Sequence, residues 1–155
     1  MPTAHQGSPA EVAALDAYIK LMRASETVTA RAHGLLGDLT ITQFGVLEAL
    51  HHRGPLCAGE IAQKILKSAG NLTLVLSNLE RDGLISRERD KTDARRWIVS
   101  LTKAGRTRIA ALFPQVAAAI TAEFAHLSPA EQGMLAELCK KLGRGRPSPE
   151  SAHVP

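Results

Sequence analysis

The sequence predicts a mainly α-helical protein with a small β-hairpin. Apolar residues recur every three or four positions in several stretches, which is the spacing of one face of a helix. Residues 85–89 and 97–101 instead alternate between the two faces of short strands. The 155 residues are 45% hydrophobic but only 3% aromatic, a composition that fits one helix-rich domain with a core.

The first predicted helix spans about residues 9–36, and we expect residues 1–8 before it to be flexible. Gly34 and Gly37 mark its end. Its apolar face is formed by Val12, Leu15, Ile19, Met22 and Val28.

The next helix is predicted to begin after Thr40, which has the capping-box spacing to Gln43, and to run to about His52. Leu39 and Phe44 can pack across this start as a hydrophobic staple.

Two short helices joined by a tight turn, about residues 58–66 and 69–82, predict a helix-turn-helix. Cys57 and Glu60 repeat the capping-box spacing, with sulfur where a hydroxyl normally accepts. Ser68 and Asn71 are expected to cap the second helix. Its apolar face consists of Leu72, Val75, Leu76 and Leu79.

The hairpin spans about residues 85–102, and residues 90–93 supply side chains that favour a turn. We expect Trp97 to pack between the hairpin and the helices rather than to stack on a base. Between residues 81 and 108 the chain carries nine basic and four acidic residues, a larger surplus than the whole-chain charge of +4. This surplus favours phosphate binding, although charge runs are also found on merely solvated surfaces.

Thr102 is expected to cap a helix from Lys103 to about Ala125, which Pro114 should kink or divide. Ser128 and Glu131 form another capping box, which predicts a last helix to about Leu142. The apolar surface of the helix from Lys103 is wide for a monomer. We expect residues 144–155 to be disordered.

Several function classes are disfavoured by the sequence. It has no apolar run long enough for a membrane span and no signal-peptide pattern, which predicts a cytoplasmic protein with two free thiols. It has neither a glycine-rich phosphate loop nor a nucleophile with a base, so we expect no enzyme and no cofactor. The spacing of His33, His51, His52 and Cys57 matches no closed zinc site, and no metal is predicted.

The run from Asn78 to Ile85, followed by Asp93-Ala94-Arg95 and Leu101-Thr102, resembles the MarR family of bacterial transcription regulators. The resemblance covers about residues 39–106. It implies a homodimeric winged helix-turn-helix core that binds a palindromic operator. The core would be flanked by N- and C-terminal dimerisation helices, about residues 9–36 and 103–142, which would pair across a two-fold axis. Such proteins are usually repressors released by a small ligand, often a phenolic or other aromatic acid, or by thiol oxidation.

The resemblance also implies roles for single residues. It places the recognition helix at residues 68–78, and the arginine that enters the minor groove would be Arg95, oriented by Asp93. In this family a ligand pocket lies between the dimer helices and the DNA-binding lobe, but no motif here identifies its residues. The other expected contacts to phosphates or major-groove base edges are Ser68, Asn71, Thr73, Ser77, Arg89, Lys91 and Arg96.

Two alternatives stay open. Cys57 lies at a helix N-terminus, which favours a reactive thiolate, whereas Glu60 opposes it and a half-buried thiol would be inert. A winged helix can also serve as a protein-interaction module, which would have no use for Arg95 and Arg96.

Overall fold

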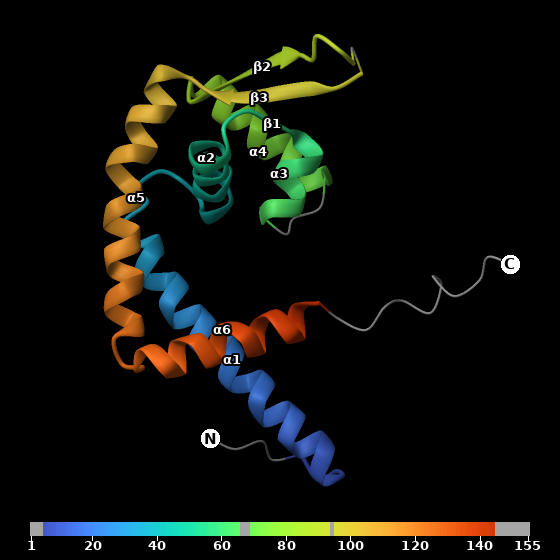
Figure 1. Ribbon diagram of the computed structural model, residues 1–155, viewed down its shortest axis with the longest axis vertical. Coiled ribbons are helices and arrows are strands. Elements are labelled where there is room, and N and C mark those ends of the chain that lie inside the picture. Colours follow the sequence, from blue (N-terminus) through green and yellow to red (C-terminus); the bar gives the residue numbers. More distant parts are fainter. Residues whose placement is uncertain (1–4, 66–68, 94, 145–155) are drawn as a thin grey trace, which may run out of the picture. The chain divides into compact units, whose positions relative to one another are not determined.

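The computed structural model describes residues 5–65, 69–93 and 95–144 (Figure 1). The chain forms α1 (Pro9–His33), α2 (Ile41–Arg53), β1 (Leu56–Cys57), α3 (Ala58–Ile65), α4 (Ala69–Arg81), β2 (Ile85–Arg89), β3 (Trp97–Leu101), α5 (Lys103–Phe124) and α6 (Pro129–Gly143). The predicted mainly helical fold class is confirmed. The described residues up to Ile120 form one compact unit and those from Thr121 form a second, and each is described by itself.

Capping boxes begin three of the helices. At α2, Gln43 N–H donates to Thr40 Oγ1 (3.1 Å) and Thr40 N–H donates to Gln43 Oε1 (2.8 Å). Ser128 and Glu131 make the same reciprocal pair at α6, so both predicted helix starts are confirmed. Ser8 caps α1 with Glu11; the sequence placed this helix start at residue 9 but did not reveal its capping box.

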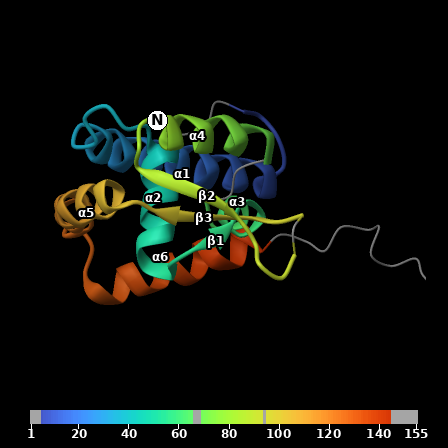
Figure 2. The ribbon, with the colours of Figure 1, turned by 90° about the horizontal axis from the view of Figure 1, so that it is seen from above.

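The sheet has three strands rather than the predicted two. Its order is β1-β3-β2, all antiparallel, and the strands can be followed in Figure 2. The predicted hairpin is present, with Ile85 opposite Leu101 and Arg89 opposite Trp97. β1 adds Leu56 opposite Val99. Two residues are too few to show a period of two, which is why the sequence did not reveal this strand.

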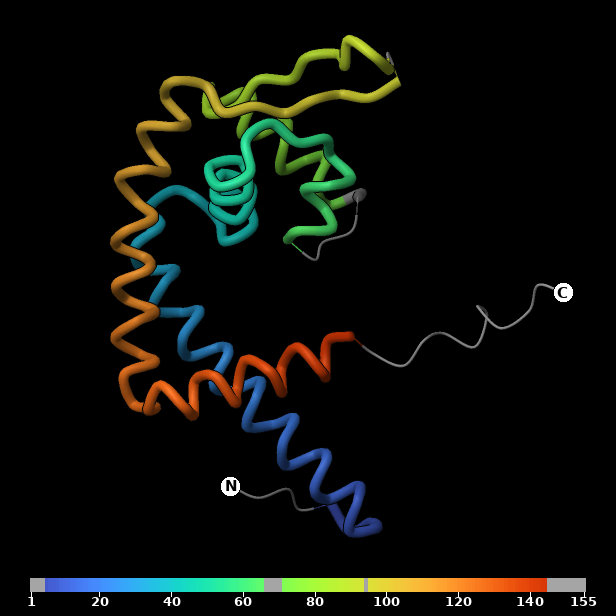
Figure 3. Tube along the Cα trace, viewed as in Figure 1, coloured from blue at the N-terminus to red at the C-terminus, as the bar shows by residue number. Residues whose placement is uncertain are grey.

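The core of the first unit lies where the helix-turn-helix, the sheet and α5 meet. The predicted apolar face of α4 is confirmed, since Leu72, Leu76 and Leu79 are buried and Val75 packs against them. Figure 3 shows the chain passing from α4 through β2 and β3 into α5. The largest fully buried side chains of this core are Leu47, Ile61, Leu72, Leu79, Ile109, Val46 and Val99.

α5 starts as predicted but is not divided at Pro114. Gly105 N–H donates to Thr102 Oγ1 (3.0 Å), and the same hydroxyl donates to Gly83 O (2.7 Å). The helix continues from Lys103 to Phe124 with Pro114 inside it. Proline has no N–H, so Pro114 leaves the carbonyl of Ala110, four residues earlier, without its helical donor. Both residues are exposed, so water can bind that carbonyl.

Some predictions fall outside this description. Ser68, residues 1–4 and residues 145–155 lie outside the described part of the chain. Among the described helices, none has by itself the length and apolar character of a membrane span, although α5 and α6 pass that test when taken together as a bent pair.

Candidate nucleic-acid interface

α4 turns one polar face to solvent because its leucine stripe is committed to the core. Asn71 and Thr73, two of the predicted base or phosphate contacts, are exposed, and Ser77 is half-buried. Leu74 shares this surface and is 67% exposed, yet the sequence reading did not select it. Its position outside the buried stripe of Leu72, Leu76 and Leu79 was the available signal.

The end of α4 is tied to the hairpin by a turn and an ion pair. Leu84 N–H donates to Leu79 O (2.9 Å) and Gly83, at φ 70°, donates to Glu80 O (3.0 Å), which is a Schellman ending. Arg87 Nε donates to Glu80 Oε2 (2.8 Å). This hydrogen bond lowers the pKa of Glu80 and raises that of Arg87. The orientation of the hairpin therefore depends on α4 itself.

The loop between β2 and β3 is ordered by Asp90. One of its carboxylate oxygens accepts the Thr92 N–H (2.7 Å), the Thr92 hydroxyl (2.6 Å) and the Asp93 N–H (3.2 Å). Asp90 N–H donates to Arg96 O (3.0 Å) and closes the loop. The hydrogen bonds from Thr92 lower the pKa of Asp90. The predicted turn is present, with Asp90 as its organising residue.

Asp93 orders the backbone and not the guanidinium of Arg95. Its carboxylate accepts the Arg95 N–H (3.0 Å), whereas the predicted charge-assisted bond to the Arg95 side chain is not found among the described residues. A carboxylate two residues before an N–H closes a local turn, and this geometry takes precedence here. Lys91 and Arg95 are exposed, and no ion pair holds either cation within the described part of the chain.

Arg89 and Trp97 form a pair at the base of the loop. They face each other in the strand register, and the Arg89 guanidinium carbon lies 5.0 Å from the centre of the Trp97 ring. Trp97 is 46% exposed, so the prediction of a packing residue between hairpin and helices is only partly right. The ring lies open at the start of the central strand β3 because an amphipathic aromatic side chain can be covered by a cation instead of by the core.

Arg96 is directed towards β1 and α3. Its Nη2 lies 3.8 Å from Glu60 Oε2, and a hydrogen bond with the Cys57 side chain is the main cause that raises the pKa of Arg96. Glu60 accepts the Cys57 N–H (2.7 Å), the carboxylate half of the predicted capping box. Cys57 is half-buried and Cys139 is exposed, and both are free thiols.

The basic surplus seen in the sequence is therefore distributed unevenly. Ion pairs join Arg81 to Asp82, Arg87 to Glu80, Arg96 to Glu60 and Arg108 to Asp38. The hairpin loop keeps its cations Lys91 and Arg95 directed to solvent. The loop next to the polar face of α4 is thus the part of this region best suited to meet phosphates.

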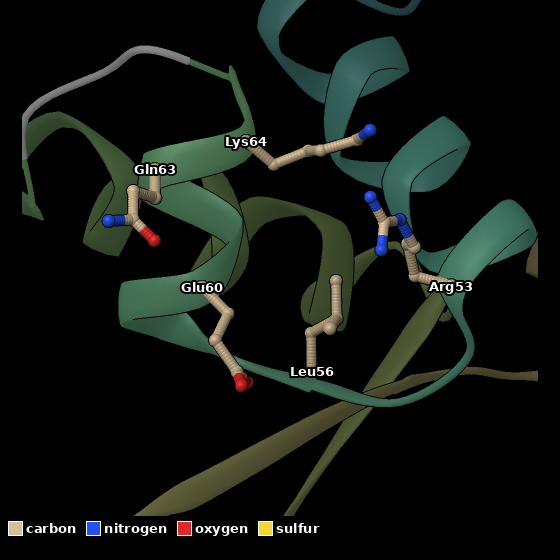
Figure 4. Close-up of a pocket in the computed structure, with 5 residues that line it drawn as sticks. All are labelled: Arg53, Leu56, Glu60, Gln63 and Lys64. Atoms are coloured by element: carbon tan, nitrogen blue, oxygen red, sulfur yellow. The ribbon is translucent and has the colours of Figure 1, made fainter.

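Two cavities flank this surface. A groove of about 450 Å³ lies between α4, α3 and the sheet, and it is lined by Ala58, Thr73, Leu76, Glu80, Arg87, Trp97 and Val99. A second cavity of about 320 Å³ lies between α2, β1 and α3, where the Arg53 and Lys64 side chains extend towards one another (Figure 4). In the described ranges no cluster of three or more metal-ligating side chains is found.

The family model of the MarR family matches residues 39–97, which span the helix-turn-helix and most of the hairpin. The regulator MhqR of Bacillus subtilis is 33% identical over 131 residues, covering 83% of this chain and 90% of MhqR. The chain belongs to the MarR family. Another relative, the helix-turn-helix transcriptional regulator YkoM of Bacillus subtilis, is 40% identical over 102 residues, 66% of each chain.

A solved MarR-type neighbour agrees with this assignment. The structure of Bordetella bronchiseptica BpsR, described for the regulation of its DNA binding by 6-hydroxynicotinic acid, is 26% identical with a TM-score of 0.74. The match covers 82% of this chain and 98% of BpsR. The predicted family and winged helix-turn-helix fold are confirmed, and the protein is a DNA-binding transcriptional regulator. Its relatives are named as regulators and not as enzymes.

Proposed function

We propose that this MarR-family regulator is a homodimeric repressor that binds a palindromic operator and is released by a small aromatic acid. The observation that supports DNA binding most directly is the pairing of two surfaces. α4 exposes Asn71 and Thr73, and the adjoining hairpin loop exposes Lys91 and Arg95. Polar side chains on a helix suit base edges in the major groove, and loop cations suit phosphates or the minor groove.

The exposed apolar faces of α1 and of α6 each support a dimer. No residue of α1 or of α6 is buried within the single chain. α1 exposes Leu15, Tyr18 and Met22, and α6 exposes Met134, Leu138 and Leu142, in both cases at helical spacing. A second copy would cover such faces, and a two-fold axis would present two copies of α4 to a palindrome. We infer that the dimer acts in the cytoplasm, where its operator is accessible.

The groove beside α4 is our candidate effector site. Its volume of about 450 Å³ is within the range for small ligands. Trp97 offers an aromatic face, and Arg87 keeps donors beyond the two that it gives to Glu80. The family resemblance implies a pocket nearer the dimer helices, whereas this groove is formed by α3, α4 and the sheet. A ligand there would act on α4 and the hairpin, the two parts that we expect to touch DNA.

DNA binding is tested by titrating the purified protein, at several salt concentrations, against the DNA immediately upstream of its own gene. A scrambled duplex of equal length is the control. We expect tight, selective binding whose affinity falls steeply with salt. Equal, weak binding to both duplexes would favour either a protein-interaction module or an operator elsewhere in the genome. Selection from a genomic library would recover such an operator and so separate the two.

Effector binding is tested with a panel of small aromatic acids that includes 6-hydroxynicotinate, the compound named for BpsR. We expect at least one acid to release the operator, and the variant Trp97→Leu to need a higher concentration of it. Arg53→Ala, which changes the second cavity, is the matched control and should respond as the wild type does. Equal sensitivity of the Trp97 variant and the wild type would place the effector elsewhere.

A thiol-sensing regulator is the second candidate, and the position of Cys57 beside the Arg96–Glu60 pair favours it, since Glu60 Oε2 accepts the Cys57 N–H (2.7 Å) and lies 3.8 Å from Arg96 Nη2. Oxidation of Cys57 would change the position of a hairpin arginine that we expect near phosphates. If this candidate is correct, peroxide should release operator DNA from the wild type but not from Cys57→Ser. Loss of binding in both proteins would exclude Cys57 as the sensor.

A further inference from the structure

Leu74 is a large apolar side chain placed in the middle of a hydrogen-bonding surface. It is the sixth residue of α4, and it is 67% exposed. Asn71 lies three positions before it, and Ser77 and Asn78 lie three and four positions after it, so all share one side of the helix. Single exposed leucines are ordinary on protein surfaces, but this one lies among side chains that can bind base edges.

The rest of the winged helix avoids such exposure. Between residues 39 and 101, the exposed large hydrophobic side chains of the described residues are Leu74 and Trp97. Trp97 has a cation from Arg89 over its ring, and it lines the groove beside α4. No comparable cover is described for Leu74, whose helix buries Leu72, Leu76 and Leu79 on the opposite side.

The major groove offers an apolar group that fits this position. Each base pair presents donors and acceptors there, and thymine adds its C5 methyl group. A leucine cannot read a donor or an acceptor, but it can bury that methyl group while flanking polar residues bind base edges. We propose that Leu74 is a specificity-determining residue that selects thymine at one position of each operator half-site. This inference rests on the proposed binding of α4 in the major groove.

The test uses deoxyuridine, which differs from thymidine only by lacking the C5 methyl group. The operator is first selected from a random duplex library, and each thymine is then replaced by uracil one position at a time. For the wild type we expect one position per half-site at which the change weakens binding about four-fold, and about fifteen-fold when both half-sites are changed. Leu74→Ala should bind the thymine and uracil duplexes equally at that position.

Three controls isolate the methyl contact. Leu74→Met keeps a flexible apolar side chain and should retain most of the preference for thymine. Leu35→Ala removes an exposed leucine that lies outside α1 and α6, and its ratio between the thymine and uracil duplexes should equal that of the wild type. Circular dichroism of Leu74→Ala checks that the variant is folded, which its exposed position favours.

The outcomes separate this inference from the proposed function. Selective operator binding together with a uracil effect that disappears in Leu74→Ala supports both. Selective binding in which no thymine methyl group depends on Leu74 overturns the role of Leu74 and leaves the repressor proposal intact. If the selection yields no preferred duplex at all, the proposed operator binding fails and the inference fails with it.

Discussion

Replacing Gly105 by alanine should destabilise the protein at the junction of hairpin and α5. Gly105 is the third residue of α5 and is buried. A Cβ atom there would lie 2.9 Å from the Leu84 carbonyl carbon, closer still to its oxygen, and 3.3 Å from Leu101 Cδ2. The first two obstacles are backbone atoms that cannot rotate away. The start of α5 must therefore separate from the turn that follows α4.

The magnitude follows from what this separation removes. Overpacking of a tight site costs about 1–3 kcal/mol. The Thr102 N–H bond to Leu84 O (3.1 Å) and the Thr102 hydroxyl bond to Gly83 O (2.7 Å) would also weaken, at about 1 kcal/mol each. Alanine gains about 1 kcal/mol of helix propensity over glycine. We expect a net loss of about 2–4 kcal/mol in the free energy of unfolding.

Urea unfolding followed by circular dichroism measures this loss. With a slope of about 2 kcal/mol per molar, the midpoint should fall by about 1–2 M. Gly133→Ala is the matched control, because Gly133 lies within α6 and a Cβ there meets nothing within 4 Å. It should be neutral or stabilising by up to about 1 kcal/mol. All proteins are compared at one concentration, since dimerisation would shift the midpoint. A Gly105→Ala midpoint equal to that of the wild type would refute the reasoning.

Three further predictions concern the hairpin loop, the ion pair beside it and a helix cap. Arg95→Ala should weaken operator binding in a salt titration and reduce the slope of log affinity against log salt concentration by about one per protomer. Arg23→Ala in α1 removes the same charge and should leave that slope unchanged. Equal slopes for the wild type and both variants would contradict a role for Arg95. The Arg87 hydrogen bond lowers the pKa of Glu80 in the folded protein below its unfolded value of 4.5. The hydrogen bond therefore stabilises the fold fully above pH 4.5, and this stabilisation is lost as the pH falls through the pKa of Glu80 in the folded protein. The stability advantage of the wild type over Glu80→Gln, measured by urea unfolding across this range, should therefore shrink in acid, and a difference independent of pH would disprove the coupling. Thr40→Ala should lower the free energy of unfolding by about 1 kcal/mol in thermal melts because it removes the α2 cap, whereas Thr42→Ala, at the second residue of α2, should cost less. The reverse order would show that the cap is unimportant.

Much of the fold was predictable because its determinants lie close together in the sequence. The boxes of Thr40 with Gln43 and Ser128 with Glu131 join residues three positions apart. The core face of α4 follows from the spacing of its leucines, and the hairpin follows from alternation around a turn. The family motifs lie in this same segment, so the sequence also located the candidate DNA-binding surface. The contacts of Asn71, Thr73, Arg89, Lys91, Arg95 and Arg96 with DNA stay predictions.

Other features could not be read from the sequence because they join distant residues. β1 is two residues long and exists because Leu56 pairs with Val99, 43 positions later. The close approach of Gly105 to Leu84 depends on how α5 leaves the sheet. The exposure of Leu74 was within reach of a helical projection, but a leucine in a helix is ordinarily assigned to the core.

The sequence by itself determined the helices, their caps, the hairpin and the family, since hydrophobic spacing and local hydrogen bonds operate within a few residues. Only the tertiary structure decided which charges are available. It paired Arg87 with Glu80 and Arg96 with Glu60, directed Asp93 to a backbone N–H, and left Lys91 and Arg95 exposed on the loop. The reason is physical: a charge acts through its distance to other charges and to water, and those distances are fixed only when strands and helices pack together.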